Sequence, residues 1–201
     1  MYKFFLLFSL SFISLFAQNI ALEAFLNKNY DKAFELYSVE AKKGDAKAQS
    51  ALSYLYLHGL GTEVDKEKSR EFLVLSAKGG YANAQYDLGM NYLIGNNVKE
   101  DHKKAFEWLS KAAEQNHADA QYNLALMYYN GDTVEVNVVK TAELLEQAAL
   151  QDHKKSKQIV GVIYMQSLKF DKAEKWLKLN AQEGDLKAQE LLKEIEEAKK
   201  N

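Results

Sequence analysis

The 201-residue chain is long enough for one domain with a substantial core, and its 26 basic and 28 acidic residues give a formal net charge of -2. This balance lacks the basic excess of a nucleic-acid-binding protein, and Arg70 is the only arginine, so nucleic acid is not an expected partner. Cysteine is absent, which excludes disulfides, thiolate nucleophiles and cysteine-ligated metals.

The first seventeen residues have the layout of a secretory signal peptide. Lys3 supplies a positive charge, an apolar run covers residues 4–16, and Ala17 offers a small residue at the cleavage position. The run is shorter than the roughly 20 residues that a membrane-spanning helix needs. We therefore expect a periplasmic or secreted protein, with a signal peptide at residues 1–17 and no stable membrane anchor after processing.

A shortened pair of helices is expected directly after this segment. Residues 19–28 carry apolar side chains on one helical face, and a second helix begins near Tyr30 and is closed by Gly44. Together they predict a first repeat at about residues 18–45.

The next segments repeat at a period of 36 residues. AKAQSALSYLYLHG at residues 46–59 returns as ANAQYDLGMNYLIG at 82–95 and as ADAQYNLALMYYNG at 118–131. A fixed period of this length is typical of stacked helical repeats. It predicts helix-turn-helix units at 46–81, 82–117 and 118–153. A last unit at 154–185 lacks the glycine-containing turn, and a polar capping helix is expected at 186–200.

Equivalent positions in these units predict a shared core. Residues four apart lie on one helical face, and the expected core pairs are Leu52 with Tyr56, Leu88 with Tyr92, Leu124 with Tyr128 and Val160 with Tyr164. The residues expected to cap the second helices are Asp65, Asp101 and Asn137.

The repeated pattern A-x-A-Q-x-x-L-x-x-x-Y-x-x-G, followed by a loop and D/N-x-x-K, resembles the Sel1-like repeat, a relative of the tetratricopeptide repeat with a longer turn. The resemblance implies an all-α, right-handed superhelical solenoid that serves as an interaction scaffold. It implies no chemistry by itself.

Signatures of catalysis are missing from the sequence. No serine is followed by lysine three positions later, and neither H-E-x-x-H nor a glycine-rich phosphate loop occurs. The four histidines lack the i, i+4 spacing of a helical metal site, and His117 and His153 are expected to be helix-start residues. We predict no catalytic, cofactor or metal site.

A partner surface is expected on the first helices of the central repeats, on the side turned away from Leu88 and Tyr92. Its aromatic, amide and apolar side chains are more typical of an interface core than of a solvated face; packing of repeat against repeat is the alternative. The candidate residues are Tyr86, Asp87, Met90, Asn91 and Ile94, with Tyr122, Asn123, Leu126 and Asn130 in the next repeat.

Three classes of function remain open. The first is an exported scaffold that binds a protein or an extended peptide in its concave groove. The second follows from the resemblance alone: cysteine-rich secreted bacterial Sel1-repeat proteins are often named as β-lactamases or penicillin binders, but this chain has none of their cysteines. The third is a binder of a cell-wall polymer. The partner's identity and the oligomeric state are left open.

Overall fold

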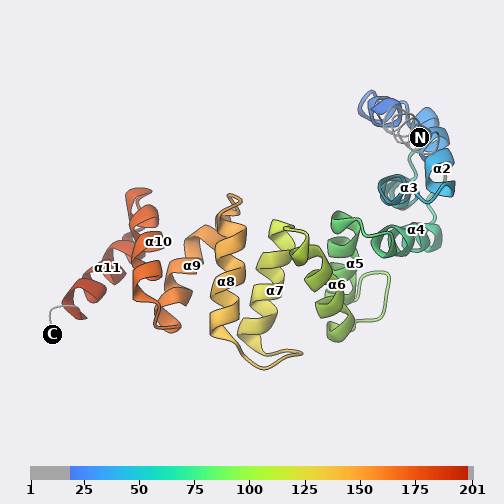
Figure 1. Ribbon diagram of the computed structural model, residues 1–201. Coiled ribbons are helices and arrows are strands. Elements are labelled where there is room, and N and C mark those ends of the chain that lie inside the picture. Colours follow the sequence, from blue (N-terminus) through green and yellow to red (C-terminus); the bar gives the residue numbers. More distant parts are fainter. Residues whose placement is uncertain (1–18, 199–201) are drawn as a thin grey trace, which may run out of the picture. The chain divides into compact units, whose positions relative to one another are not determined.

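The computed structural model describes residues 19–198, and this part of the chain contains helices and turns but no strand (Figure 1). Residues 19–26 are helical. The helices that follow are α2 (Tyr30–Lys42), α3 (Ala46–His58), α4 (Lys66–Lys78), α5 (Ala82–Ile94), α6 (His102–Glu114), α7 (Ala118–Asn130), α8 (Val138–Ala149), α9 (Lys154–Gln166), α10 (Phe170–Gln182) and α11 (Leu186–Ala198). The signal peptide expected at residues 1–17 lies outside the described residues.

The chain forms two compact units, which divide between Lys99 and Glu100. In unit 1, α2 packs on α3, α3 on α4, and α4 on α5. In unit 2, each helix from α6 to α11 packs on the next one along the chain. Packing between consecutive antiparallel helices is the arrangement of a helical repeat. The all-α repeat solenoid predicted from the sequence is confirmed.

The second helices of the central repeats begin with the capping side chains that the sequence predicts. Asp65, Asp101 and Asn137 each accept a hydrogen bond from the backbone N–H three residues later, with N–O distances of 2.9, 3.0 and 2.8 Å. The same backbone hydrogen bond lowers the pKa of Asp65 and of Asp101. Each cap satisfies an amide group that the helix itself leaves unpaired.

The core of each unit is built from the leucines and alanines at equivalent repeat positions. Leu52 and Leu88 are buried in unit 1, and Leu124 and Val160 are buried in unit 2. The tyrosines paired with them differ in burial: Tyr164 is buried, whereas the other three, Tyr56, Tyr92 and Tyr128, are half-buried.

A glutamine near the start of α3, α5 and α7 bonds each of these repeats to the preceding one, whereas α9 carries Lys157 at this position. The amide nitrogens of Gln49, Gln85 and Gln121 donate to the backbone carbonyls of Ala41, Ala77 and Ala113, at 3.3, 3.1 and 3.3 Å. In every case the partner is eight residues earlier, at the end of the preceding second helix. Gln189 donates to Ala181 in the same way, at 3.4 Å.

Two glycines lie where another part of the chain comes very close. A Cβ added to Gly161 in α9 would lie 3.0 Å from the Cγ of Leu177 in α10, so the absence of a side chain lets these helices approach. Gly61, in the turn after α3, has a φ of +68°, and a Cβ there would overlap the carbonyl oxygen of Tyr30 at the start of α2. The turn after α3 is therefore held against the beginning of α2.

Candidate functional site

The residues predicted to bind a partner lie on helices of both units, and each set is described by itself. Helix α5 of unit 1 carries Tyr86, Asp87, Met90, Asn91 and Ile94, and α7 of unit 2 carries Tyr122, Asn123, Leu126 and Asn130. All nine are half-buried or exposed. None is part of the buried core.

On α7, the aromatic side chain packs against the next repeat. The ring of Tyr122 lies 4.8 Å from the ring of His153 at the start of α9, and the ammonium group of Lys155 lies 5.8 Å from the centre of the tyrosine ring. His153 also lies 3.3 Å from the carboxylate of Asp119. These contacts join α7 to α9, so Tyr122 contributes to packing between repeats.

On α5, three of the predicted residues line a pocket of about 340 Å³ in unit 1. Asp87, Met90 and Asn91 form one wall. The other lining residues come from α3, α4 and the loop after α5; they are Ser50, Ser53, Tyr54, Leu57, Ser69, Arg70, Leu73, Asn96 and Asn97. We call this the α3–α5 pocket. Of the residues predicted on α5, Asp87, Met90 and Asn91 therefore line the pocket, whereas Tyr86 and Ile94 do not.

Polar groups from all three helices are held in place around the α3–α5 pocket. The hydroxyls of Ser53 and Ser69 lie 3.2 Å apart and are buried. The Asn96 amide donates to the Asn91 side-chain oxygen at 3.3 Å. Arg70 donates to the backbone carbonyl of Asn97 at 3.3 Å and pairs with Glu67. The pocket therefore combines amide, hydroxyl and guanidinium groups with an apolar side formed by leucine and methionine.

Two of these residues depart from the repeat pattern. Asn91 occupies the position that holds Leu55, Met127 and Ile163 in the other first helices, all of them buried. Burying such a side chain stabilises a fold by roughly 1.5–3 kcal/mol, and asparagine forgoes that contribution.

Arg70 stands where the second helices on either side, α2 and α6, carry Phe34 and Phe106, while α8 and α10 have Ala142 and Glu174. Asn91 was predicted as a site residue and Arg70 was not, because the position of Arg70 varies among the second helices.

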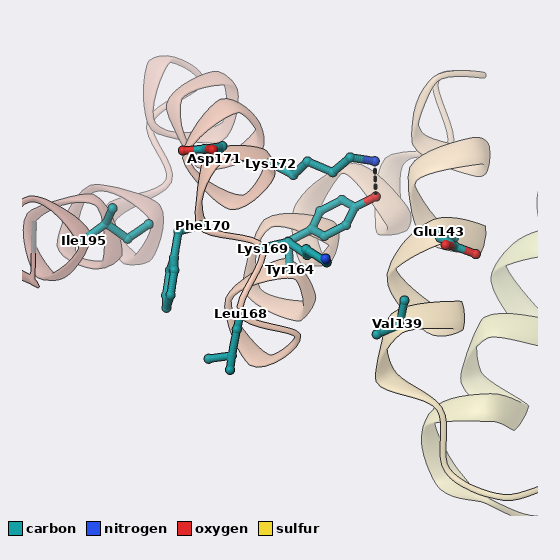
Figure 2. Close-up of a pocket in the computed structure, with 9 residues that line it drawn as sticks. All are labelled: Val139, Glu143, Tyr164, Leu168, Lys169, Phe170, Asp171, Lys172 and Ile195. Atoms are coloured by element: carbon teal, nitrogen blue, oxygen red, sulfur yellow. Dashed lines mark hydrogen bonds between the residues drawn. The ribbon is translucent and has the colours of Figure 1, made fainter.

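A second pocket, of about 610 Å³, lies in unit 2 (Figure 2). It is bounded by the start of α8, the turn between α9 and α10, and α11. The lining residues are Val139, Glu143, Tyr164, Leu168, Lys169, Phe170, Asp171, Lys172 and Ile195. We call this the α8–α11 pocket. None of these residues was predicted as a site residue, although the loss of the glycine-containing turn in the repeat at 154–185 marks the place in the sequence.

A hydrogen-bonded cluster beside the α8–α11 pocket joins α8, α9 and α10. Glu146 accepts from the Tyr164 hydroxyl and the Lys172 ammonium, both at 2.6 Å, and from the Trp176 indole at 3.3 Å. The Lys172 ammonium also donates to the Tyr164 hydroxyl at 3.1 Å (Figure 2). Three helices are thereby tied to one carboxylate.

The cluster shifts the pKa of each of its titratable members. Burial raises the pKa of Glu146, but the hydrogen bonds from Lys172, Tyr164 and Trp176 outweigh it and leave that pKa lowered. Burial, together with donation to Glu146, raises the pKa of Tyr164 to about 12. The hydrogen bond to Glu146 raises the pKa of Lys172. At neutral pH the cluster therefore holds an ionised carboxylate, a neutral phenol and an ammonium group.

Replacing Glu146 with glutamine is expected to lower the free energy of unfolding by about 1–3 kcal/mol at pH 7, because partly buried donors lose their charged acceptor. The lowered pKa means that folded Glu146 binds a proton less tightly than the unfolded residue does. Its contribution is therefore present above the ordinary pKa of 4.5 and is lost as the pH falls below it.

Denaturant unfolding from pH 3 to pH 7 measures this effect. Glu146→Gln should flatten the acid limb of the stability curve, while the control Glu143→Gln, one turn earlier on α8 and half-exposed, should leave that limb unchanged. Equal acid limbs in the wild type and Glu146→Gln would contradict the assignment.

Residues 19–198 contain no group of histidine and acidic side chains placed to hold a metal ion. The ring nitrogens of His117 and His153 accept hydrogen bonds from the backbone N–H of Ala120 and of Ser156, which makes both histidines caps of first helices. Among the described helices, none is long and apolar enough to cross a membrane.

Comparison with known proteins places these features in a family. The Sel1 repeat family matches residues 23–45, 46–81, 82–117 and 118–153. A search of curated proteins gave no match.

Two of the solved structures that are similar to this chain illustrate the relationship. A Sel1 repeat protein from Oxalobacter formigenes is 28% identical with a TM-score of 0.75, over 86% of this chain and 73% of that one. The protective antigen c5321 of uropathogenic Escherichia coli, which displays an SLR fold, is 30% identical with a TM-score of 0.66, over 77% of this chain and 34% of that one.

Proposed function

Because the chain belongs to the Sel1 repeat family, whose helical repeats generally mediate protein–protein interaction, we propose that it is an exported bacterial scaffold that binds a protein or an extended peptide. The binding surface is the α5 face of unit 1, centred on the α3–α5 pocket. The α7 residues Asn123, Leu126 and Asn130 form a separate candidate surface in unit 2.

The observation that carries this proposal is the polar character of the α3–α5 pocket: Asn91 stands where the other repeats have Leu55, Met127 and Ile163, and Arg70 where α2 and α6 have phenylalanine. Asn91 and Arg70 forgo apolar burial, and their hydrogen bonds to Asn96 and Asn97 are no substitute for a packed core. Side-chain amides supply both a donor and an acceptor, which are the groups that the main chain of an extended peptide offers in return. Leu57, Leu73 and Met90 provide an apolar wall for a side chain of that peptide.

A variant that restores the repeat pattern tests the proposal. Asn91→Leu copies Leu55 of α3, and Arg70→Phe copies Phe34 and Phe106 of α2 and α6, so the fold should be kept and the melting midpoint equal or higher. We expect this variant to lose partner binding, because the amide and guanidinium groups are gone.

Photo-cross-linking in the producing bacterium provides the measurement, with a photo-reactive amino acid in place of Met90. Discrete cross-linked products should form with the otherwise wild-type chain and disappear in the double variant. The control Asn83→Leu changes an exposed asparagine on α5 that is absent from the pocket lining, and it should retain the products. A folded double variant with the same cross-linked products would show that the α3–α5 pocket is not the site.

The proposed export is tested by measuring the mass of the mature protein. The charge, apolar run and small residue of residues 1–17 support removal of this segment near Ala17. We expect the protein from the envelope or medium fraction to lack about these seventeen residues by intact-mass measurement. A full-length species confined to the cytosolic fraction would contradict export.

A further inference from the structure

The turn between α9 and α10 exposes an apolar residue at an unusual position. Leu168 has a φ of +58° and is 73% exposed. The corresponding short turn in unit 1 carries Lys28, with a φ of +59° and an exposed side chain. The backbone conformation is therefore the same in both turns. Lysine is an ordinary residue for a turn in contact with water, whereas leucine there leaves an apolar side chain uncovered.

The residue that begins the following helix is also less covered in unit 2. In unit 1, the backbone of Tyr30 at the start of α2 is covered by the turn that contains Gly61. In unit 2, Phe170 occupies the equivalent position at the start of α10, lines the α8–α11 pocket and remains 43% exposed.

The α8–α11 pocket thus has an apolar rim and an apolar floor. Leu168, Phe170 and Val139 are exposed around it, and the buried residues Tyr164 and Ile195 lie below them. Figure 2 shows Leu168 on the turn beside the pocket, with Val139 across from it on α8. A projecting apolar side chain next to an apolar pocket is what a two-fold contact requires, since each copy then offers both halves of the contact.

The charges around the α8–α11 pocket also fit a second copy of the same surface. Glu143 and Asp171 are acidic, while Lys169 and Lys172 are basic, and Lys172 is already paired with Glu146. A partner of one charge gains little from a rim that carries both signs. A second copy of the same surface, rotated by a two-fold axis, can place its acidic residues opposite Lys169.

We propose that the α8–α11 pocket is the contact surface of a homodimer, in which Leu168 of each copy enters the pocket of the other copy beside Val139. The contact is isologous, so every interaction occurs twice. It uses unit 2 alone and does not depend on the partner bound by unit 1.

Sedimentation equilibrium over a concentration series of the purified chain tests the proposal. The wild type should show a reversible monomer–dimer equilibrium. Leu168→Lys copies the residue of the equivalent turn in unit 1, so it should fold normally and raise the dimer dissociation constant about tenfold or more for each of the two contacts. The control Leu150→Lys changes an equally exposed leucine (69%) at the opposite end of α8 and should leave the constant unchanged.

A second measurement does not depend on how Leu168→Lys folds. The chain has no cysteine, so Leu168→Cys and Val139→Cys each create a single thiol. Mixing the two variants and adding a short bifunctional thiol reagent should give a 168–139 cross-linked pair. A monomeric wild type throughout the series, a dimer weakened equally by both lysine variants, or a mixture without the 168–139 product would overturn the proposal.

Discussion

Replacing Leu88 with alanine is expected to lower the free energy of unfolding of unit 1 by about 2–5 kcal/mol, the usual range for a buried leucine changed to alanine. Leu88 is 1% exposed in α5, and α5 packs on α4. The truncation leaves a cavity that a helix held on its neighbour cannot fully close. Denaturant unfolding of the full chain, followed by a probe in unit 1, measures the loss.

Ile94 supplies the control for this prediction on the same helix. Its side chain is 63% exposed, so Ile94→Ala should change the free energy of unfolding by no more than about 0.5 kcal/mol. If the two variants unfold at the same denaturant concentration, the assignment of the buried face of α5 is wrong.

Replacing Gly61 with alanine is the second change with a large expected effect. The alanine Cβ would overlap the Tyr30 carbonyl oxygen, and that atom belongs to the backbone at the start of α2. The left-handed conformation adds about 1–2 kcal/mol for a residue with a Cβ. We expect a total loss of about 3 kcal/mol or more, because the turn must also move away from α2.

Gly44→Ala separates the two contributions to this loss. Gly44 also has a positive φ, of +89°, but a Cβ there would meet nothing within 4 Å. Its replacement should therefore cost only the conformational term, about 1–2 kcal/mol. Hydrogen exchange in α2 provides a local readout: Gly61→Ala should reduce its protection more than Gly44→Ala does. Equal protection in the two variants would show that the contact with Tyr30 does not stabilise α2.

The sequence predicts the parts of this fold that depend on neighbours along the chain. The caps Asp65, Asp101 and Asn137 are such parts, because each bonds an amide group only three residues away. The 36-residue period likewise locates the buried leucines, since residues four apart must share a face of a helix.

Other features depend on contacts that a repeated pattern does not contain. Tyr92 was predicted to lie in the core with Leu88, but it is half-buried, whereas Tyr164 at the equivalent position is buried and bonded to Glu146. The division between Lys99 and Glu100 falls inside a repeat, where the sequence period continues unchanged. Each pocket is lined by a residue that differs from its counterparts in other repeats, Asn91 in the α3–α5 pocket and Leu168 in the α8–α11 pocket, and this difference is the signal in the sequence.

The glutamine bond between repeats has a consequence for how such a chain can change in length. Gln49, Gln85 and Gln121 each donate to the carbonyl eight residues earlier, so the junctions in front of the three 36-residue repeats use the same two partners. A duplicated or deleted block of 36 residues brings an identical glutamine to an identical carbonyl. The hydrogen bond between the neighbouring repeats then forms without any compensating substitution elsewhere. Evolution can therefore lengthen or shorten the array in whole repeats.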